Sequence, residues 1–174
     1  GTLRWTYAGA TSFISGSAVL SADGGSVYFG SGDRKLHAVD SATGTARWTY
    51  TVGGSILACT PAVDSNGVIY VGCYDGKLYA ISANGTLKRT WDTAQRIRSS
   101  PAIFGSTLYV GSNDAKLYAF DIGATAAGGS WPQYGQNVRR VGRGVSEPTF
   151  ATQPVNQTAS AGASITLTAA APGS

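Results

Sequence analysis

The sequence is poor in charged residues and contains no long apolar run. Its 174 residues include 13 Lys or Arg and 9 Asp or Glu, which gives a net charge of +4. Such a composition is typical of a compact, strand-rich protein outside the cytoplasm and argues against disorder. No stretch approaches the roughly 20 apolar residues that span a membrane, so we expect no membrane span.

Residues that carry catalysis are scarce. His37 is the only histidine and Glu147 the only glutamate. A lone histidine supports neither a zinc site nor a catalytic triad, and a single glutamate does not support a glycosidase. No nucleophile-elbow, P-loop or zinc-protease string occurs. The scattered basic residues lack an aromatic stripe, so nucleic-acid binding is not expected. The sequence predicts no enzyme, with no catalytic, metal-binding or cofactor-binding residues.

Tryptophan, in contrast, recurs at a regular spacing. Trp5, Trp48, Trp91 and Trp131 are separated by 43, 43 and 40 residues. The first three close similar phrases, G-T-L-R-W at 1–5, G-T-A-R-W at 44–48 and G-T-L-K-R-T-W at 85–91. A period of about 40 residues built from short strands is typical of a β-propeller, in which each repeat is one blade. We therefore expect the four indole rings to pack between blades.

The rest of the repeat predicts strands. Segments beginning Y-F-G-S-G-D, Y-V-G-C-Y-D and Y-V-G-S-N-D start at Tyr28, Tyr70 and Tyr109. Runs such as 78–81 and 117–120 are apolar at every position, which favours strands covered on both faces. The prediction is an all-β fold, a partial β-propeller of about three four-stranded blades of about 40 residues each. The expected blades are 6–48, 49–91 and 92–131.

Two sets of side chains have a chemical and a structural interpretation. Asp33, Asp75 and Asp114 recur at one place in the repeat, where a ring of carboxylates would bind cations. Hairpin turns also favour such residues because they tolerate positive φ, and we prefer that interpretation. His37 stands where the other repeats have tyrosine, so we expect it to occupy an aromatic packing position.

The two cysteines, Cys59 and Cys73, flank the turn at 64–67. Their positions vary together, being a serine pair in each neighbouring repeat, which indicates that the two side chains touch. A cross-strand disulfide in an exported protein and two free, buried thiols are both consistent with this pattern.

The phrase A-V-D-S-A-T-G-T-A-R-W at 38–48 resembles the blade-closing phrase of the pyrroloquinoline-quinone-like (PQQ-like) propeller repeats. The resemblance covers 1–143 and implies that each tryptophan packs against a neighbouring blade. Segment 130–143 is similar to the edge segment of secreted PQQ-like propellers, which implies a latching strand, although a basic, solvated connector is the alternative. We expect a linker at 144–152. Residues 153–174 resemble the start of a bacterial immunoglobulin-like (Ig-like) domain, which is truncated here.

Three functions follow from this resemblance. The leading one is a non-catalytic propeller module of a secreted or cell-surface bacterial multidomain protein, acting as a scaffold or as a binding surface for a protein or cell-surface polymer. The second is a fragment of a PQQ-dependent dehydrogenase. That family places its quinone and calcium against a disulfide of adjacent cysteines, whereas the cysteines here are 14 residues apart. The third is an outer-membrane protein assembly scaffold, against which the Ig-like segment argues.

The same resemblance has implications for the number of blades and for the location of the protein. Closed propellers have about four to eight blades, so we expect the missing blades to come from the same full-length chain. An extracellular, cell-surface or periplasmic location is expected.

Overall fold

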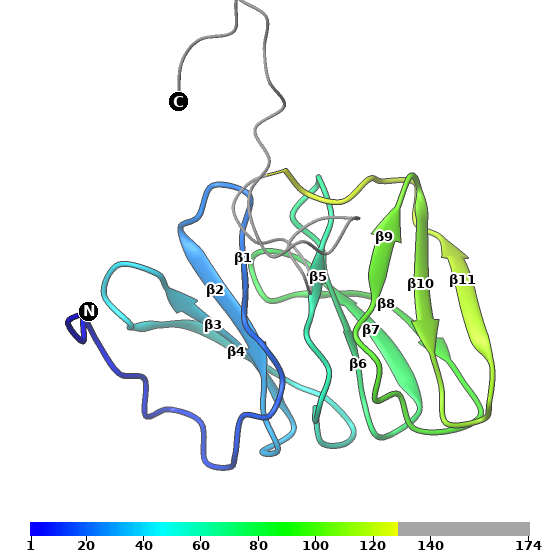
Figure 1. Cartoon of the computed structure of the whole chain (residues 1–174), viewed down its shortest axis with the longest axis horizontal. Coiled ribbons are helices and arrows are strands. Elements are labelled where there is room, and N and C mark those ends of the chain that lie inside the picture. The colour runs from blue at the N-terminus through cyan, green and yellow to red at the C-terminus, as the bar shows by residue number, and fades with distance from the viewer. Residues whose placement is uncertain (129–174) are drawn as a thin grey trace, which may run out of the picture. The chain divides into compact units, whose positions relative to one another are not determined.

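The computed structural model describes residues 1–128, and all of the regular structure in this part is β-strand (Figure 1). None of these residues belongs to a helix that is long and apolar enough to cross a membrane. Trp131, the closing segment 130–143, the linker 144–152 and the Ig-like segment 153–174 lie outside the described residues.

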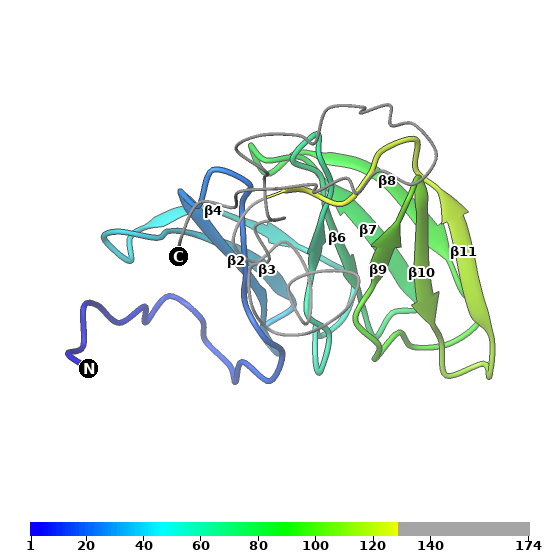
Figure 2. The ribbon, with the colours of Figure 1, turned by 45° about the horizontal axis from the view of Figure 1, so that its top comes forward.

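The strands form three antiparallel sheets in chain order (Figures 1 and 2). The first contains β1 (Val19–Leu20), β2 (Ser26–Gly30), β3 (Lys35–Asp40) and β4 (Ala46–Thr51). The second contains β5 (Ala62–Val63), β6 (Ile69–Gly72), β7 (Lys77–Ile81) and β8 (Leu87–Asp92). The third contains β9 (Ala102–Phe104), β10 (Thr107–Gly111) and β11 (Leu117–Asp121). The chain is therefore an all-β partial propeller, and within residues 1–128 its third sheet has three strands instead of the expected four.

Apolar residues on the facing surfaces of the sheets form two core clusters. One joins the first and second sheets through side chains that include Tyr28, Leu36 and Ile69. The other joins the second and third sheets and includes Tyr70, Leu78 and Leu108. The second sheet is buried on both faces because it has a neighbour on each side, as the apolar run at 78–81 predicts. The same prediction is wrong for the run at 117–120, because within the described residues the third sheet has a neighbouring sheet on one side alone, and Leu117 is exposed.

The recurring aspartates close the hairpins between the second and third strands of each sheet. The Oδ1 atoms of Asp33, Asp75 and Asp114 accept a hydrogen bond from the backbone N–H two residues later, at 3.1, 3.0 and 3.1 Å. The turn interpretation is thus confirmed, but the left-handed conformation belongs to the residue after each aspartate. That residue is Arg34 (φ 67°), Gly76 (φ 84°) or Ala115 (φ 65°).

Candidate functional site

The first two tryptophans each lie on the hairpin turn of the following sheet. Trp5 Nε1 donates a hydrogen bond to the carbonyl oxygen of Ser41 at 3.0 Å, and Trp48 Nε1 donates to that of Ala83 at 2.8 Å. Each ring covers a glycine with positive φ, Gly44 or Gly85. A Cβ atom at Gly85 would lie only 2.9 Å from the Trp48 ring, so the turn has no room for a side chain there.

Trp91 has different surroundings. Its ring packs on Phe120 and Tyr70, with centroid distances of 5.3 and 6.2 Å, and the Arg89 guanidinium lies 4.9 Å from its centroid. After β11 the chain does not return as a hairpin. It crosses instead to the second sheet, where Thr125 O accepts a hydrogen bond from the backbone N–H of Ser65 at 2.8 Å.

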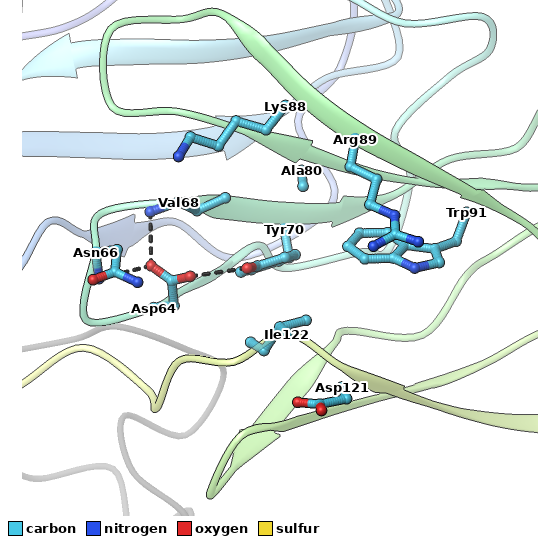
Figure 3. A pocket seen from close by; sticks show the side chains of 10 residues that line it. All are labelled: Asp64, Asn66, Val68, Tyr70, Ala80, Lys88, Arg89, Trp91, Asp121 and Ile122. Atoms are coloured by element: carbon cyan, nitrogen blue, oxygen red, sulfur yellow. Dashed lines mark hydrogen bonds between the residues drawn. The ribbon is translucent and has the colours of Figure 1, made fainter.

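Where residues 122–127 cross to the second sheet, a pocket of about 300 Å³ lies beside Trp91, between the second and third sheets (Figure 3). It is lined by Asp64, Asn66, Val68, Tyr70, Ala80, Lys88, Arg89, Trp91, Asp121 and Ile122. In Figure 3 the Arg89 side chain extends across the face of Trp91, while Asp121 lies on the opposite side of the pocket from Lys88. Sequence reasoning missed this pocket because it depends on where the chain goes after β11, which the repeat pattern does not encode.

Asp64 is the buried polar residue of the pocket. It is 1% exposed, and its Oδ1 accepts hydrogen bonds from the backbone N–H groups of Asn66 and Val68 at 2.8 and 2.9 Å. Its Oδ2 accepts one from Tyr70 Oη at 2.8 Å. Burial and the neighbouring Asp64 carboxylate raise the pKa of Tyr70. Both residues therefore have structural partners that hold them in place.

We expect Asp64→Asn to lower the free energy of unfolding by about 1–2 kcal/mol, because the amide must place an N–H group where a carboxylate oxygen accepts the Tyr70 hydrogen bond. Urea denaturation followed by circular dichroism measures this loss. Asp121→Asn is the matched control, since Asp121 lines the same pocket but is exposed and accepts one backbone N–H, from Gly123. Equal losses in the two variants would contradict the structural role of Asp64.

The pocket brings two cationic side chains, Lys88 and Arg89, together with two acidic ones, Asp64 and Asp121. Lys88 and Arg89 present cations beside an aromatic face, which suits an anionic or polar segment. Its lining contains no serine, cysteine or histidine. Across residues 1–128, no group of three or more His, Cys, Asp or Glu side chains is arranged to hold a metal ion.

His37 is fully buried and has partners on both ring nitrogens. Its Nδ1 lies 3.0 Å from Tyr7 Oη, its Nε2 lies 3.1 Å from Asp33 Oδ2, and its ring stacks on Phe29 at 5.1 Å. Burial tends to raise the pKa of Asp33, but hydrogen bonds from Thr11 N–H and from His37 outweigh it and lower the pKa overall. The ring therefore packs in the aromatic position expected for it, shielded from solvent.

The hydrogen bond between His37 and Asp33 belongs to the repeat. Tyr79 and Tyr118, which occupy the same position in the other sheets, donate hydrogen bonds to Asp75 and Asp114 four residues earlier. Sequence reasoning treated the aspartates and the aromatic residues separately. Their constant four-residue spacing was the signal from which a contact between them could have been predicted.

Of the two alternatives for Cys59 and Cys73, the structure contains the free, buried thiols and not the disulfide. Cys59 Sγ accepts a hydrogen bond from the backbone N–H of Gly72 at 3.2 Å, whereas Cys73 Sγ faces Gly54. In the third sheet, Ser99 Oγ accepts the N–H of Gly111 at 2.8 Å in the same way. The first position of the pair therefore accepts the same backbone N–H in the second and third sheets. Burial raises the pKa of each thiol to about 12.

Comparison with known proteins gives three findings. A family model described as outer membrane protein assembly factor BamB matches residues 1–174. Lupanine 17-hydroxylase [cytochrome c] of Pseudomonas sp. is 43% identical over 53 residues, which are 30% of this chain and 8% of that protein. The crystal structure of the WD40 β-propeller domain of Doa1 is similar with a TM-score of 0.51 and 26% identity, over 55% of this chain and 33% of that one. The chain thus spans less than a tenth of the length of the hydroxylase.

Proposed function

Since the chain belongs to the PQQ-like repeat family described as outer membrane protein assembly factor BamB, we propose that it is a non-catalytic propeller module that acts as a scaffold or binding surface. We place it in a secreted or cell-surface bacterial multidomain protein, in contact with a protein or cell-surface polymer. Its proposed location is extracellular, at the cell surface or periplasmic.

One observation carries this proposal: the distinctive side chains of the repeat are engaged in folding contacts. Trp5 and Trp48 dock on turns, and the repeated aspartates close hairpins. The single histidine is 0% exposed and has a partner on each ring nitrogen. A catalytic group must reach its substrate, whereas His37 is shielded from solvent and the tryptophans and aspartates are engaged in turn contacts. The pocket at Trp91 offers binding groups without a serine, cysteine or histidine.

The similarity to lupanine 17-hydroxylase favours a second candidate, a fragment of a quinoprotein dehydrogenase. The residues present do not fit the quinone and calcium that such enzymes use. The sequence has no adjacent cysteines, and the described part of the chain has no cluster of metal-ligating side chains. Under this reading the quinone site belongs to other parts of a longer protein.

A titration distinguishes these candidates. The whole chain is titrated with PQQ and Ca²⁺ while its tryptophan fluorescence and dye-linked turnover are recorded. We expect no saturable change in fluorescence and no turnover. Saturable binding together with turnover would overturn the non-catalytic proposal and support the dehydrogenase fragment.

The description of the matching family favours an outer-membrane protein assembly scaffold as a more specific form of the leading proposal. Because the match extends through residue 174, the Ig-like resemblance of 153–174 does not exclude this form. A pull-down with purified outer-membrane assembly components separates it from other binding modules. Retention of a component at physiological salt would support it, and the absence of retention would leave the general scaffold.

A further inference from the structure

Tyr74 and two arginines form a cluster at the edge of the sheets where β10 ends and β11 begins (Figure 1). Tyr74 lies in the turn between β6 and β7, and Arg96 and Arg98 lie in the connection from β8 to β9. The guanidinium carbons of Arg96 and Arg98 lie 5.5 and 5.8 Å from the centroid of the Tyr74 ring. Both arginines are exposed, and Tyr74 is half-buried. The second and third sheets thus build this cluster without either end of the chain.

The backbone holds the two arginines beside the tyrosine ring. Between them, Ile97 N–H donates a hydrogen bond to Cys73 O at 3.0 Å, and the Ile97 side chain is 0% exposed. The carbonyl oxygen of Arg96 accepts a further hydrogen bond from Asn113 N–H at 2.9 Å. Because Ile97 is buried and the arginines on either side of it are exposed, both guanidinium groups lie on the solvent side of an anchored loop.

The corresponding place between the first and second sheets carries no charge. It has Ser55 and Leu57 instead of the two arginines, and Gly32 instead of the tyrosine. Ile56, like Ile97, donates its N–H to the turn of the preceding sheet, at 3.1 Å, which fixes this correspondence. Leu57 Cδ2 would lie 3.4 Å from a Cβ atom at Gly32 and so covers that turn. The loop therefore packs without an aromatic ring or a charge, and the tyrosine and arginines are additions to the repeat.

The polar atoms of the cluster lack partners within residues 1–128. Apart from contact with the Tyr74 ring, neither guanidinium forms an ion pair or a side-chain hydrogen bond, and the Tyr74 hydroxyl donates to no acceptor. The neighbouring Asp75 is occupied, because it accepts hydrogen bonds from Lys77 N–H and Tyr79 Oη. Two positive charges thus share one ring with no counter-charge from this part of the chain, and an anion would stabilise them.

We propose that Tyr74, Arg96 and Arg98 bind a carboxylate side chain from an acidic segment of a partner protein. A guanidinium group presents a planar pair of N–H donors that matches the two oxygens of a carboxylate, and the Tyr74 hydroxyl supplies a further donor. Tyrosine and arginine are also among the residues enriched at the positions that contribute most to protein interfaces. The site rests on the proposed role of the chain as a binding surface, and it specifies where that surface lies.

The charges around the cluster favour a protein partner over a long polyanion. Asp75, Asp92 and Asp114 lie at the same edge of the sheets, and Asp92 forms an ion pair with Lys77. A nucleic acid or phosphate polymer is negative along its whole length, so it would meet these carboxylates wherever it extended past the arginines. A protein segment can place an acidic residue at the arginines and neutral or basic residues beside it.

An NMR titration of the whole ¹⁵N-labelled chain with a short peptide of alternating Glu and Gly tests the site. We expect saturable shifts of the side-chain Nε–Hε signals of Arg96 and Arg98, and weaker binding at higher salt. The same peptide with Gln in place of Glu should leave these signals unchanged. Arg96→Gln/Arg98→Gln should weaken binding about tenfold or more, and Tyr74→Phe about threefold, because charge-assisted hydrogen bonds are the stronger ones.

Arg34→Gln/Lys116→Gln is the matched control. Both residues are exposed in the corresponding turns of the first and third sheets, so this variant loses the same charge outside the cluster. It should keep the wild-type affinity within about twofold. Equal weakening in the two double variants, no saturable binding of the Glu peptide, or binding of inorganic polyphosphate in its place would overturn the site. The non-catalytic proposal is tested separately, by the titration with PQQ and Ca²⁺.

Discussion

Gly72→Ala is expected to lower the free energy of unfolding by about 3 kcal/mol, near the upper end for overpacking a closed core. A Cβ atom at Gly72 would lie 2.2 Å from Cγ2 and 2.9 Å from Cβ of Ile97. Ile97 is 0% exposed and β-branched, so it has little freedom to move aside. For a chain of this size the loss corresponds to a melting temperature lower by roughly 6–12 °C. Thermal unfolding followed by circular dichroism measures it.

The repeat provides a matched control for this substitution. Gly111 holds the same position in the third sheet, but a Cβ atom there would meet only Ser99, at 3.5 Å from its Oγ. Gly111→Ala should therefore change the melting temperature by less than about 2 °C. Ile97→Ala combined with Gly72→Ala should cost less than the sum of the two single substitutions, because the smaller side chain leaves room for the new methyl group. Equal effects of Gly72→Ala and Gly111→Ala would show that the contact with Ile97 is unimportant.

The pair Gly72 and Gly111 also shows how far the sequence could predict the fold. The period, the strand runs and the hairpin aspartates predict the all-β partial propeller, because each depends on local chemistry repeated along the chain. A glycine position that has no room for a Cβ atom and one that has room for it look the same in the repeated sequence. Only the position of Ile97 on the neighbouring loop distinguishes them.

The pocket is a second feature that the repeated sequence could not predict. Its residues are distributed over the second and third sheets, and it exists because residues 122–127 depart from the hairpin that residues 41–45 form. The departure is a deviation from the repeat, and a pattern predicts only what recurs. The contact between His37 and Asp33, in contrast, was available from the sequence, because the four-residue spacing recurs in all three sheets.

Trp48→Ala is expected to lower the free energy of unfolding by about 3 kcal/mol, the lower end of the range for tryptophan truncation because the ring is partly buried. The substitution removes the ring from the turn at Gly85 and the hydrogen bond to Ala83 O. It therefore detaches the first sheet from the second, and both sheets should become easier to open. Chemical denaturation followed by circular dichroism, together with hydrogen exchange of the amides of β7, measures the effect.

Trp48→Phe separates the two contributions of this side chain. Phenylalanine keeps an aromatic ring on Gly85 but cannot donate to Ala83 O, so the loss should fall to about 1–1.5 kcal/mol, the net value of one hydrogen bond. An intermediate loss in this variant and a large one in Trp48→Ala would mean that ring burial contributes more than the hydrogen bond. If instead the free energy of unfolding of Trp48→Ala lies within about 0.5 kcal/mol of the wild-type value, as for an ordinary surface substitution, the tryptophans do not hold the sheets together. The recurring spacing of 43 residues then has another cause.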